Sequence, residues 1–244
     1  MFTALTEAWR ALSPPHGDKD GPLTPFLVVL TIVTGLVDAF SYLVLGHVFV
    51  ANMTGNVVFL AFGLVGAKGF STAASLLALV AFALGAVGSG RVVGRLRGRR
   101  GRILAATAAC ESFLVGVSVI VAVSVGSPGT GGVRYLLVAL LGLSAGMQNG
   151  TARKLAVPDL TTTVLTQTIA AAAFDSRLGG GPDSKVGRRG LSVLAMFFGA
   201  LAGAAVILHV YRALSLVFAF ALLAPVSVSA YRLSRSQPAW DEPT

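Results

Sequence analysis

The chain alternates long apolar stretches with short basic or glycine-rich connections. Apolar runs of about 20 residues, long enough to cross the hydrocarbon core of a membrane, recur along its length. They cover residues 25–46, 72–94, 103–125, 132–152, 190–211 and 213–232. This pattern predicts an all-α polytopic membrane protein with six transmembrane helices.

Two further apolar stretches, 47–67 and 158–175, lie between these runs. The first has about 14 continuous apolar residues, which is short for a span. The second lies between two basic segments, and a full crossing would place one of them outside the cell. A half-helix that enters and leaves on the same side avoids this if its backbone is buried in protein or lines a cavity. We therefore predict two re-entrant half-helices, although the sequence leaves open that either stretch spans fully.

Composition supports a membrane environment, since 55% of the residues are hydrophobic and only 12% are charged. A soluble domain of this size would lack adequate polar surface. The net charge of +9 could suit nucleic acid, but the basic residues lie in short loops rather than along one helix face. The lipid bilayer is therefore the predicted partner, and nucleic acid is not. The lone Cys110 excludes an internal disulfide, and we predict no metal and no cofactor.

The basic loop at 91–102, with the sequence RVVGRLRGRRGR, sets the predicted orientation. Short arginine-rich loops stay on the cytoplasmic side of a membrane. The alternation of spans then places both termini inside the cell, in a bacterial plasma membrane. Residues 1–24 have no apolar core typical of a signal peptide and are expected to form a flexible tail, and 235–244 form a second tail.

Two short runs recur at a distance of about 111 residues, GLVD ending at Asp38 and GMQN ending at Asn149. In each copy a polar half-helix start follows 16 or 17 residues later. We predict two repeats, 25–125 and 132–234, each with one span, a half-helix and two further spans. Because three crossings separate the copies, the second has the opposite orientation, which is the plan of many secondary transporters.

Small residues recur at four-residue spacing, which lets helix backbones approach closely within a membrane. These positions are Gly142, Gly146 and Gly150, Gly199 and Gly203, and Ala81, Gly85 and Ser89. We expect the helices that carry them to contact protein on that face.

The run GLVDAFSYLVLGHVFVANMTGN, with the later GMQNG and TTTVLTQT, resembles the YoaK-like family of bacterial membrane proteins, a domain of unknown function numbered 1275. The resemblance covers residues 25–232 and implies a permease without an assigned substrate. The residues that match the family pattern are Gly35, Asp38, Ala39, Phe49, Asn52, Thr54, Gly55 and Asn56. The second half departs from the pattern, because Gln167 follows Thr166 where a glycine is expected.

Asp38 is the leading candidate for chemistry, because an acid within a membrane span is costly unless it is paired or hydrated. It could bind and release a proton, or it could be satisfied by backbone donors of the adjacent half-helix. The uncharged Asn149 is its counterpart, with Gln148 beside it. At the half-helix starts, free N–H groups and the positive dipole end favour an anionic group. The remaining candidates for substrate binding or coupling are Asn52, Thr54, Gly55 and Asn56 with Thr166, Gln167 and Thr168.

The function predicted from these residues is a secondary transporter for a small polar or anionic solute, with proton coupling through Asp38 as an option. A non-transporting structural or regulatory subunit is the alternative, and a passive channel is a minor one. An intramembrane serine protease is a minor one, based on the G-x-S-x-G run around Ser144 with His209 as a base. Because a transporter is the leading prediction, we expect no enzyme activity. Glycine-rich faces also make a homodimer one option.

Overall fold

The computed structural model describes residues 2–14, 18, 20–97, 99–125, 128–157, 165–176, 180 and 186–236. Within these ranges the regular elements are all helices. They are α1 (Phe2–Leu12), α2 (Leu23–Val44), α3 (Met53–Leu64), α4 (Thr72–Arg95), α5 (Arg100–Ser124), α6 (Gly131–Leu155), α7 (Leu165–Phe174), α8 (Val186–His209) and α9 (Leu214–Ser236). The all-α prediction is thus confirmed for the described chain.

The six predicted spans each coincide with a long helix, and five of these are apolar enough to cross a membrane. The sixth, α6, is as long as the others but carries Arg134, Gln148 and Asn149, which lower its hydropathy. Large apolar side chains face outward on the long helices, as in the row Leu76, Val80, Leu84 and Val87 of α4, which are 48–58% exposed. Contiguous exposed apolar faces of this kind require lipid around them. The chain is a multi-pass membrane protein.

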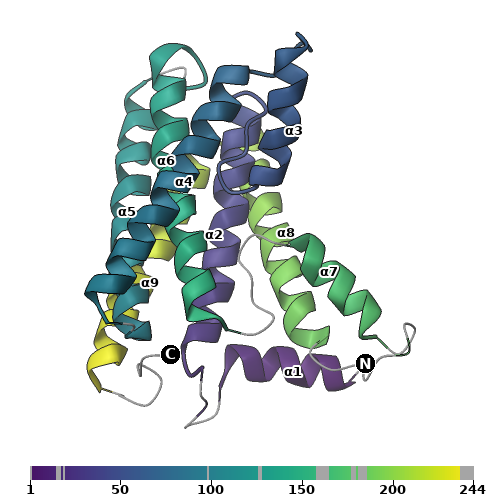
Figure 1. Ribbon diagram of the computed structural model, residues 1–244, viewed down its shortest axis with the longest axis vertical. Helices are drawn as coiled ribbons and strands as arrows, with labels where there is room; N and C mark the ends of the chain where they lie inside the picture. The colour runs from purple at the N-terminus through teal and green to yellow at the C-terminus, as the bar shows by residue number, and fades with distance from the viewer. Residues whose placement is uncertain are drawn as a thin grey trace.

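α2 and α6 are the first long helices of the two halves of the chain. α2 packs against α8 and α9, whereas α6 packs against α4 and α5 (Figure 1). A long contact between α5 and α9 joins the two groups. The first long helix of each half therefore packs mainly against helices of the other half.

The predicted close approach of helices occurs along both main contacts. A Cβ added to Gly146 of α6 would meet the backbone of Phe82 in α4, and one added to Gly199 of α8 would meet the backbone of Ile32 in α2. Only a residue without a side chain allows two helix backbones to lie this close. The glycine spacing in the sequence thus identified real contact faces.

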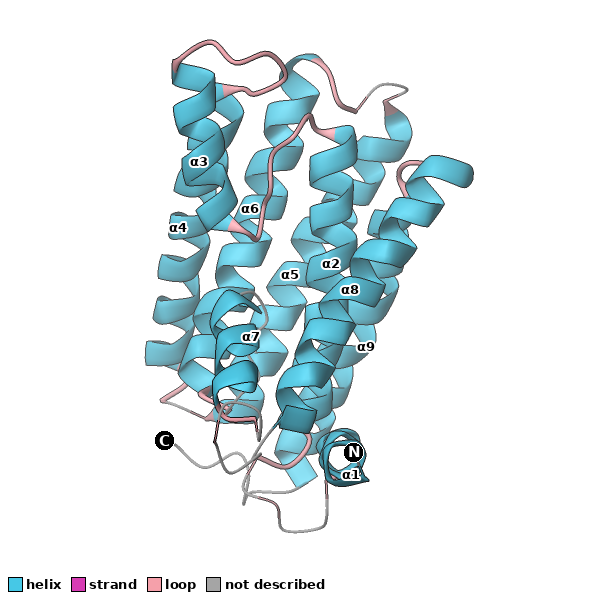
Figure 2. Ribbon diagram, turned by 90° about the vertical axis from the view of Figure 1, so that its right-hand side faces the viewer, coloured by secondary structure: helices cyan, strands magenta, loops and turns pink. Residues whose placement is uncertain are grey.

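Two short helices lie on one side of the bundle at opposite ends. α3 occupies the upper half beside α4, and α7 occupies the lower half beside α8 (Figure 1). The quarter-turn view also places α3 above α7 (Figure 2). Their lengths, 12 and 10 residues, are too short to cross a bilayer as helices.

The N-terminal stretch differs from the flexible tail expected for 1–24, because residues 2–12 form helix α1. This helix lies across the lower end of the bundle and packs against α8 (Figures 1 and 2). The Glu7 carboxylate accepts a hydrogen bond of 3.1 Å from Gly187 N, which is one of the free donors at the start of α8. A search for long apolar runs misses α1, because its apolar residues are spread along one face of a short helix.

At the same end, the buried Arg100 ties three elements together. Its guanidinium donates to Asp20 Oδ1 at 2.8 Å and to the carbonyl oxygen of Leu155 at 2.9 Å. These contacts connect the starts of α2 and α5 to the end of α6. One residue of the basic loop is therefore a structural anchor.

Candidate functional site

Asp38 lies in the C-terminal half of α2 and is 4% exposed. Its Oδ1 atom accepts hydrogen bonds from Val50 N at 3.1 Å and Ala51 N at 2.9 Å. Both donors belong to the non-helical segment 45–52, which leads from α2 to α3. Oδ2 is also buried and has no hydrogen-bond partner among the described residues. The carboxyl group therefore holds the segment with one oxygen and leaves the other unpaired.

Asn56 holds the same segment from the other side. Its Oδ1 accepts from Phe49 N at 3.0 Å and its Nδ2 donates to Phe49 O, so its amide pairs with both backbone groups of one residue. The side chain is fully buried. Asp38 and Asn56 thus fix three consecutive residues, 49–51, that lie outside any helix.

The other candidates at the start of α3 have different surroundings. Asn52 and Thr54 are exposed, and the Asn52 side chain makes no capping hydrogen bond. A Cβ on Gly55 would lie 2.9 Å from the ring of Phe49. Phe49 therefore occupies the space beside Gly55.

Gln148 of α6 reaches the same face of α2, one turn below Asp38. Its Nε2 donates to Thr34 Oγ1 at 2.7 Å and to Leu30 O at 3.1 Å. Thr34 and Asp38 are four residues apart on one helix and so lie above one another. The structure thus places Gln148 near Asp38, whereas Asn149 is half-buried on the adjacent position of α6. Thr34 was not among the predicted residues, although its spacing from Asp38 could have indicated it.

The contact between Gln148 and Thr34 gives a testable coupling. We expect Gln148→Met and Thr34→Val to destabilise the protein, with a coupling energy of about 0.6 to 1.7 kcal/mol in a double-mutant cycle. Thr31→Val is the matched control, because Thr31 donates only within its own helix, to Leu27 O. Thermal unfolding in detergent measures the cycle of Gln148→Met with Thr34→Val and the control cycle of Gln148→Met with Thr31→Val. A Thr31 coupling as large as that of Thr34 would contradict a direct hydrogen bond.

The candidates of the second half lie on α7. Thr166 and Gln167 are exposed and Thr168 is 7% exposed. α7 packs against α8 and α3 packs against α4, so the two groups of candidates are carried by different parts of the bundle. The predicted half-helix 158–175 begins at residues 158–164, which lie outside the described residues.

The remaining polar residues within the long helices lie in different parts of the bundle. Arg134 of α6 donates to Gly46 O at 3.2 Å. Glu111 is 1% exposed on α5, and its Oε2 has no partner among the described residues. His209 ends α8, which packs mainly on α2, whereas Ser144 lies in α6. Cys110 is exposed.

A cavity of about 1090 Å³ lies away from Asp38, between the start of α5 and the end of α9. Arginines and small apolar side chains line it. None of the predicted site residues is among them. Asp38, Asn56 and Gln148 are instead buried and bonded to backbone groups of their own chain.

Comparison with known proteins places this chain among relatives. The family model described as "Protein of unknown function (DUF1275)" matches residues 26–229. The UPF0700 transmembrane protein YoaK of Bacillus subtilis (strain 168) is 32% identical over 150 residues, which are 61% of this chain and 65% of that protein. The chain thus spans slightly less than two thirds of this curated relative, and no solved structure matches. By the match over residues 26–229, the chain belongs to the DUF1275 family.

Proposed function

We propose that this protein is a secondary transporter in the bacterial plasma membrane, built from two inverted repeats of three spanning helices and one re-entrant half-helix. Its proposed cargo is a small polar or anionic solute. The arginine-rich end with both termini faces the cytoplasm in this proposal, following the distribution of basic residues.

The packing of the helices supports the inverted repeat. Exchange of α2, α3, α4 and α5 with α6, α7, α8 and α9 converts each main contact into another observed contact. The α2–α8 contact becomes α6–α4, α2–α9 becomes α6–α5, and α3–α4 becomes α7–α8. The α5–α9 contact maps onto itself, as expected at a two-fold axis. In inverted-repeat transporters, substrate sites lie near such an axis at broken helices.

The observation that carries the proposal is the Oδ2 atom of Asp38, which is buried where α2 meets the start of α3 and has no partner among the described residues. Within a membrane such an acid marks ion or proton pathways more often than a structural contact. The Asp38 carboxyl group already accepts hydrogen bonds from the two N–H groups that precede α3. These donors are therefore not available to the anionic group that the sequence predicted at this half-helix. A proton on Asp38 fits this position better, and the uncharged Asn149 makes the second half the better place for an anionic group.

The helix contacts also indicate which parts would move. The α2–α8 and α4–α6 pairs are held by backbone-to-backbone contact at glycines, so each pair would move as a rigid unit. The α5–α9 contact would be the scaffold between them. The Gln148–Thr34 hydrogen bond crosses from one pair to the other, and alternating access would break and re-form it.

Reconstitution tests the proposal directly. Wild-type protein and Asp38→Asn are placed in liposomes with an internal pH dye, and solute gradients are screened for proton flux. We expect at least one polar or anionic solute to drive flux in the wild type and the flux to fall at least about tenfold in the variant, since proton transfer by a positioned group contributes 10² or more.

Thr31→Val serves as the control, because it alters a buried polar group of α2 away from Asp38 and should keep the flux. A structural or regulatory subunit remains the second candidate, since Asp38, Asn56 and Gln148 all bind backbone groups of their own chain. Absence of flux from folded wild type across a broad solute panel would favour that alternative.

A further inference from the structure

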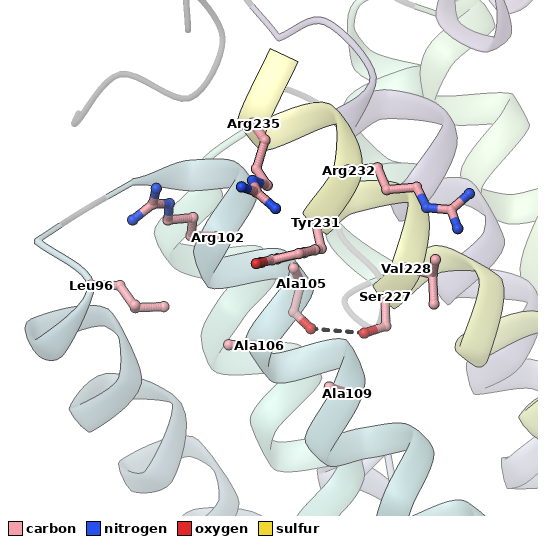
Figure 3. Close-up of a pocket in the computed structure, with 10 residues that line it drawn as sticks. All are labelled: Leu96, Arg102, Ala105, Ala106, Ala109, Ser227, Val228, Tyr231, Arg232 and Arg235. Atoms are coloured by element: carbon pink, nitrogen blue, oxygen red, sulfur yellow. Dashed lines mark hydrogen bonds between the residues drawn. The ribbon is translucent and has the colours of Figure 1, made fainter. Parts of the chain in front are cut away.

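The cavity between α5 and α9 combines an apolar floor with a cationic rim. Its floor is formed by Ala105, Ala106 and Ala109 of α5, and Val228 and Tyr231 of α9 form a wall (Figure 3). Val228 and Tyr231 are 50% and 53% exposed, so the cavity opens on the outer surface of the bundle. In a membrane this surface faces lipid.

The cavity exists because the α5 residues that line it beyond Arg102 are all alanines. Ser227 Oγ donates to Ala105 O at 3.0 Å and holds α9 against α5 beside the floor (Figure 3). Further along the same pair of helices, Phe220 of α9 fills the corresponding seam, and its ring would lie 3.1 Å from a Cβ on Gly116. The hollow is therefore specific to the end that carries the arginines.

Three exposed arginines surround this hollow, Arg102 of α5 with Arg232 and Arg235 of α9. The Arg235 guanidinium lies 5.8 Å from the Tyr231 ring centroid. A smaller neighbouring cavity shares Arg102 and adds Arg95, Arg97 and Arg99 as lining residues. The tendency of basic loops to stay on the cytoplasmic side of a membrane is sufficient to explain the arginines. It does not explain why an apolar groove lies next to them.

We propose that this cavity binds an anionic phospholipid. The arginines bind its phosphate, since the guanidinium fork matches phosphate oxygens in bidentate geometry. One acyl chain lies along the alanine floor between α5 and Val228. Basic pockets between membrane helices near the cytoplasmic surface are suited to such headgroups. The inference rests on the membrane location and does not depend on transport.

Native mass spectrometry of the full chain in detergent tests this site, with dioleoylphosphatidylglycerol as the probe and dioleoylphosphatidylcholine as the neutral comparison. We expect tighter binding of the anionic lipid, and a loss of about fivefold in its affinity for each of Arg102→Gln and Arg235→Gln. Arg153→Gln, at the end of α6 and outside the cavity, should leave the affinity unchanged.

Ala106→Phe tests the groove itself, because a ring there fills the floor and leaves every arginine in place. It should weaken binding at least as much as the loss of one arginine. Ala83→Phe, on an exposed position of α4, should not. Elution volume and helical circular dichroism establish that each variant is folded.

Three results would overturn the proposal. Equal losses from Arg102→Gln and Arg153→Gln would mean that diffuse charge alone attracts the lipid. Wild-type affinity in Ala106→Phe would mean that the groove holds no acyl chain. Displacement of the lipid by soluble glycerol phosphate at similar concentration would identify a site for free phosphate compounds instead.

Discussion

Gly85→Val is expected to abolish the native bundle. Gly85 faces α6, and a Cβ there would lie 2.9 Å from the backbone carbon of Leu143 and 3.0 Å from Met147 N. A valine cannot be accommodated by a side-chain rearrangement, because the obstructing atoms are backbone. We expect a loss of about 3 kcal/mol or more, with aggregation during purification. Size-exclusion chromatography and thermal unfolding in detergent measure it.

The same helix provides the control. Gly88 lies three residues further along α4, and a Cβ there would have no other atom within 4 Å. Gly88→Val therefore makes the same chemical change towards open space and should leave elution and unfolding close to wild type. Similar damage from both substitutions would show that glycine matters for the flexibility of α4 and not for its contact with α6.

The long helices were predictable because each physical requirement acts locally. A span needs about 20 apolar residues, and close packing needs small residues at four-residue spacing, so both are visible in the sequence. Asp38 was identified for the same reason, because an acidic residue within an apolar run is easily recognised in the sequence. Its alternative interpretation, a carboxylate bound by backbone donors near the half-helix, is the geometry found at Oδ1.

The parts that were missed depend on contacts between distant residues. Nothing local to Arg100 indicates that it binds Asp20 and Leu155 while its neighbours line cavities. The cavity itself arises where alanines of α5 meet α9, which requires the packing of two helices far apart in sequence. Phe49 over Gly55 is a third example, because the glycine serves a contact within the protein.

Asp38→Ala is expected to cost more than any other change at the polar centre. It removes the acceptor of the Val50 and Ala51 N–H groups, and both residues are almost fully buried. Each buried donor left without a partner costs about 1 to 3 kcal/mol, so the free energy of unfolding should fall by about 2 to 6 kcal/mol. Thermal unfolding in detergent measures this loss. Ser41→Ala is the control, because Ser41 donates only to a backbone carbonyl of its own helix.

Asp38→Asn separates the two roles of the side chain. Its amide oxygen can accept the same two hydrogen bonds, but its buried NH2 group has no acceptor among the described residues, so the free energy of unfolding should fall by about 1 to 3 kcal/mol, less than in Asp38→Ala. It cannot bind and release a proton, so any function that uses the free Oδ2 is lost while the segment 45–52 stays in place. If Asp38→Asn lowers the free energy of unfolding as much as Asp38→Ala does, then the carboxyl group itself is required for stability. Asp38 would then be a structural residue, and the transport proposal would lose its main support.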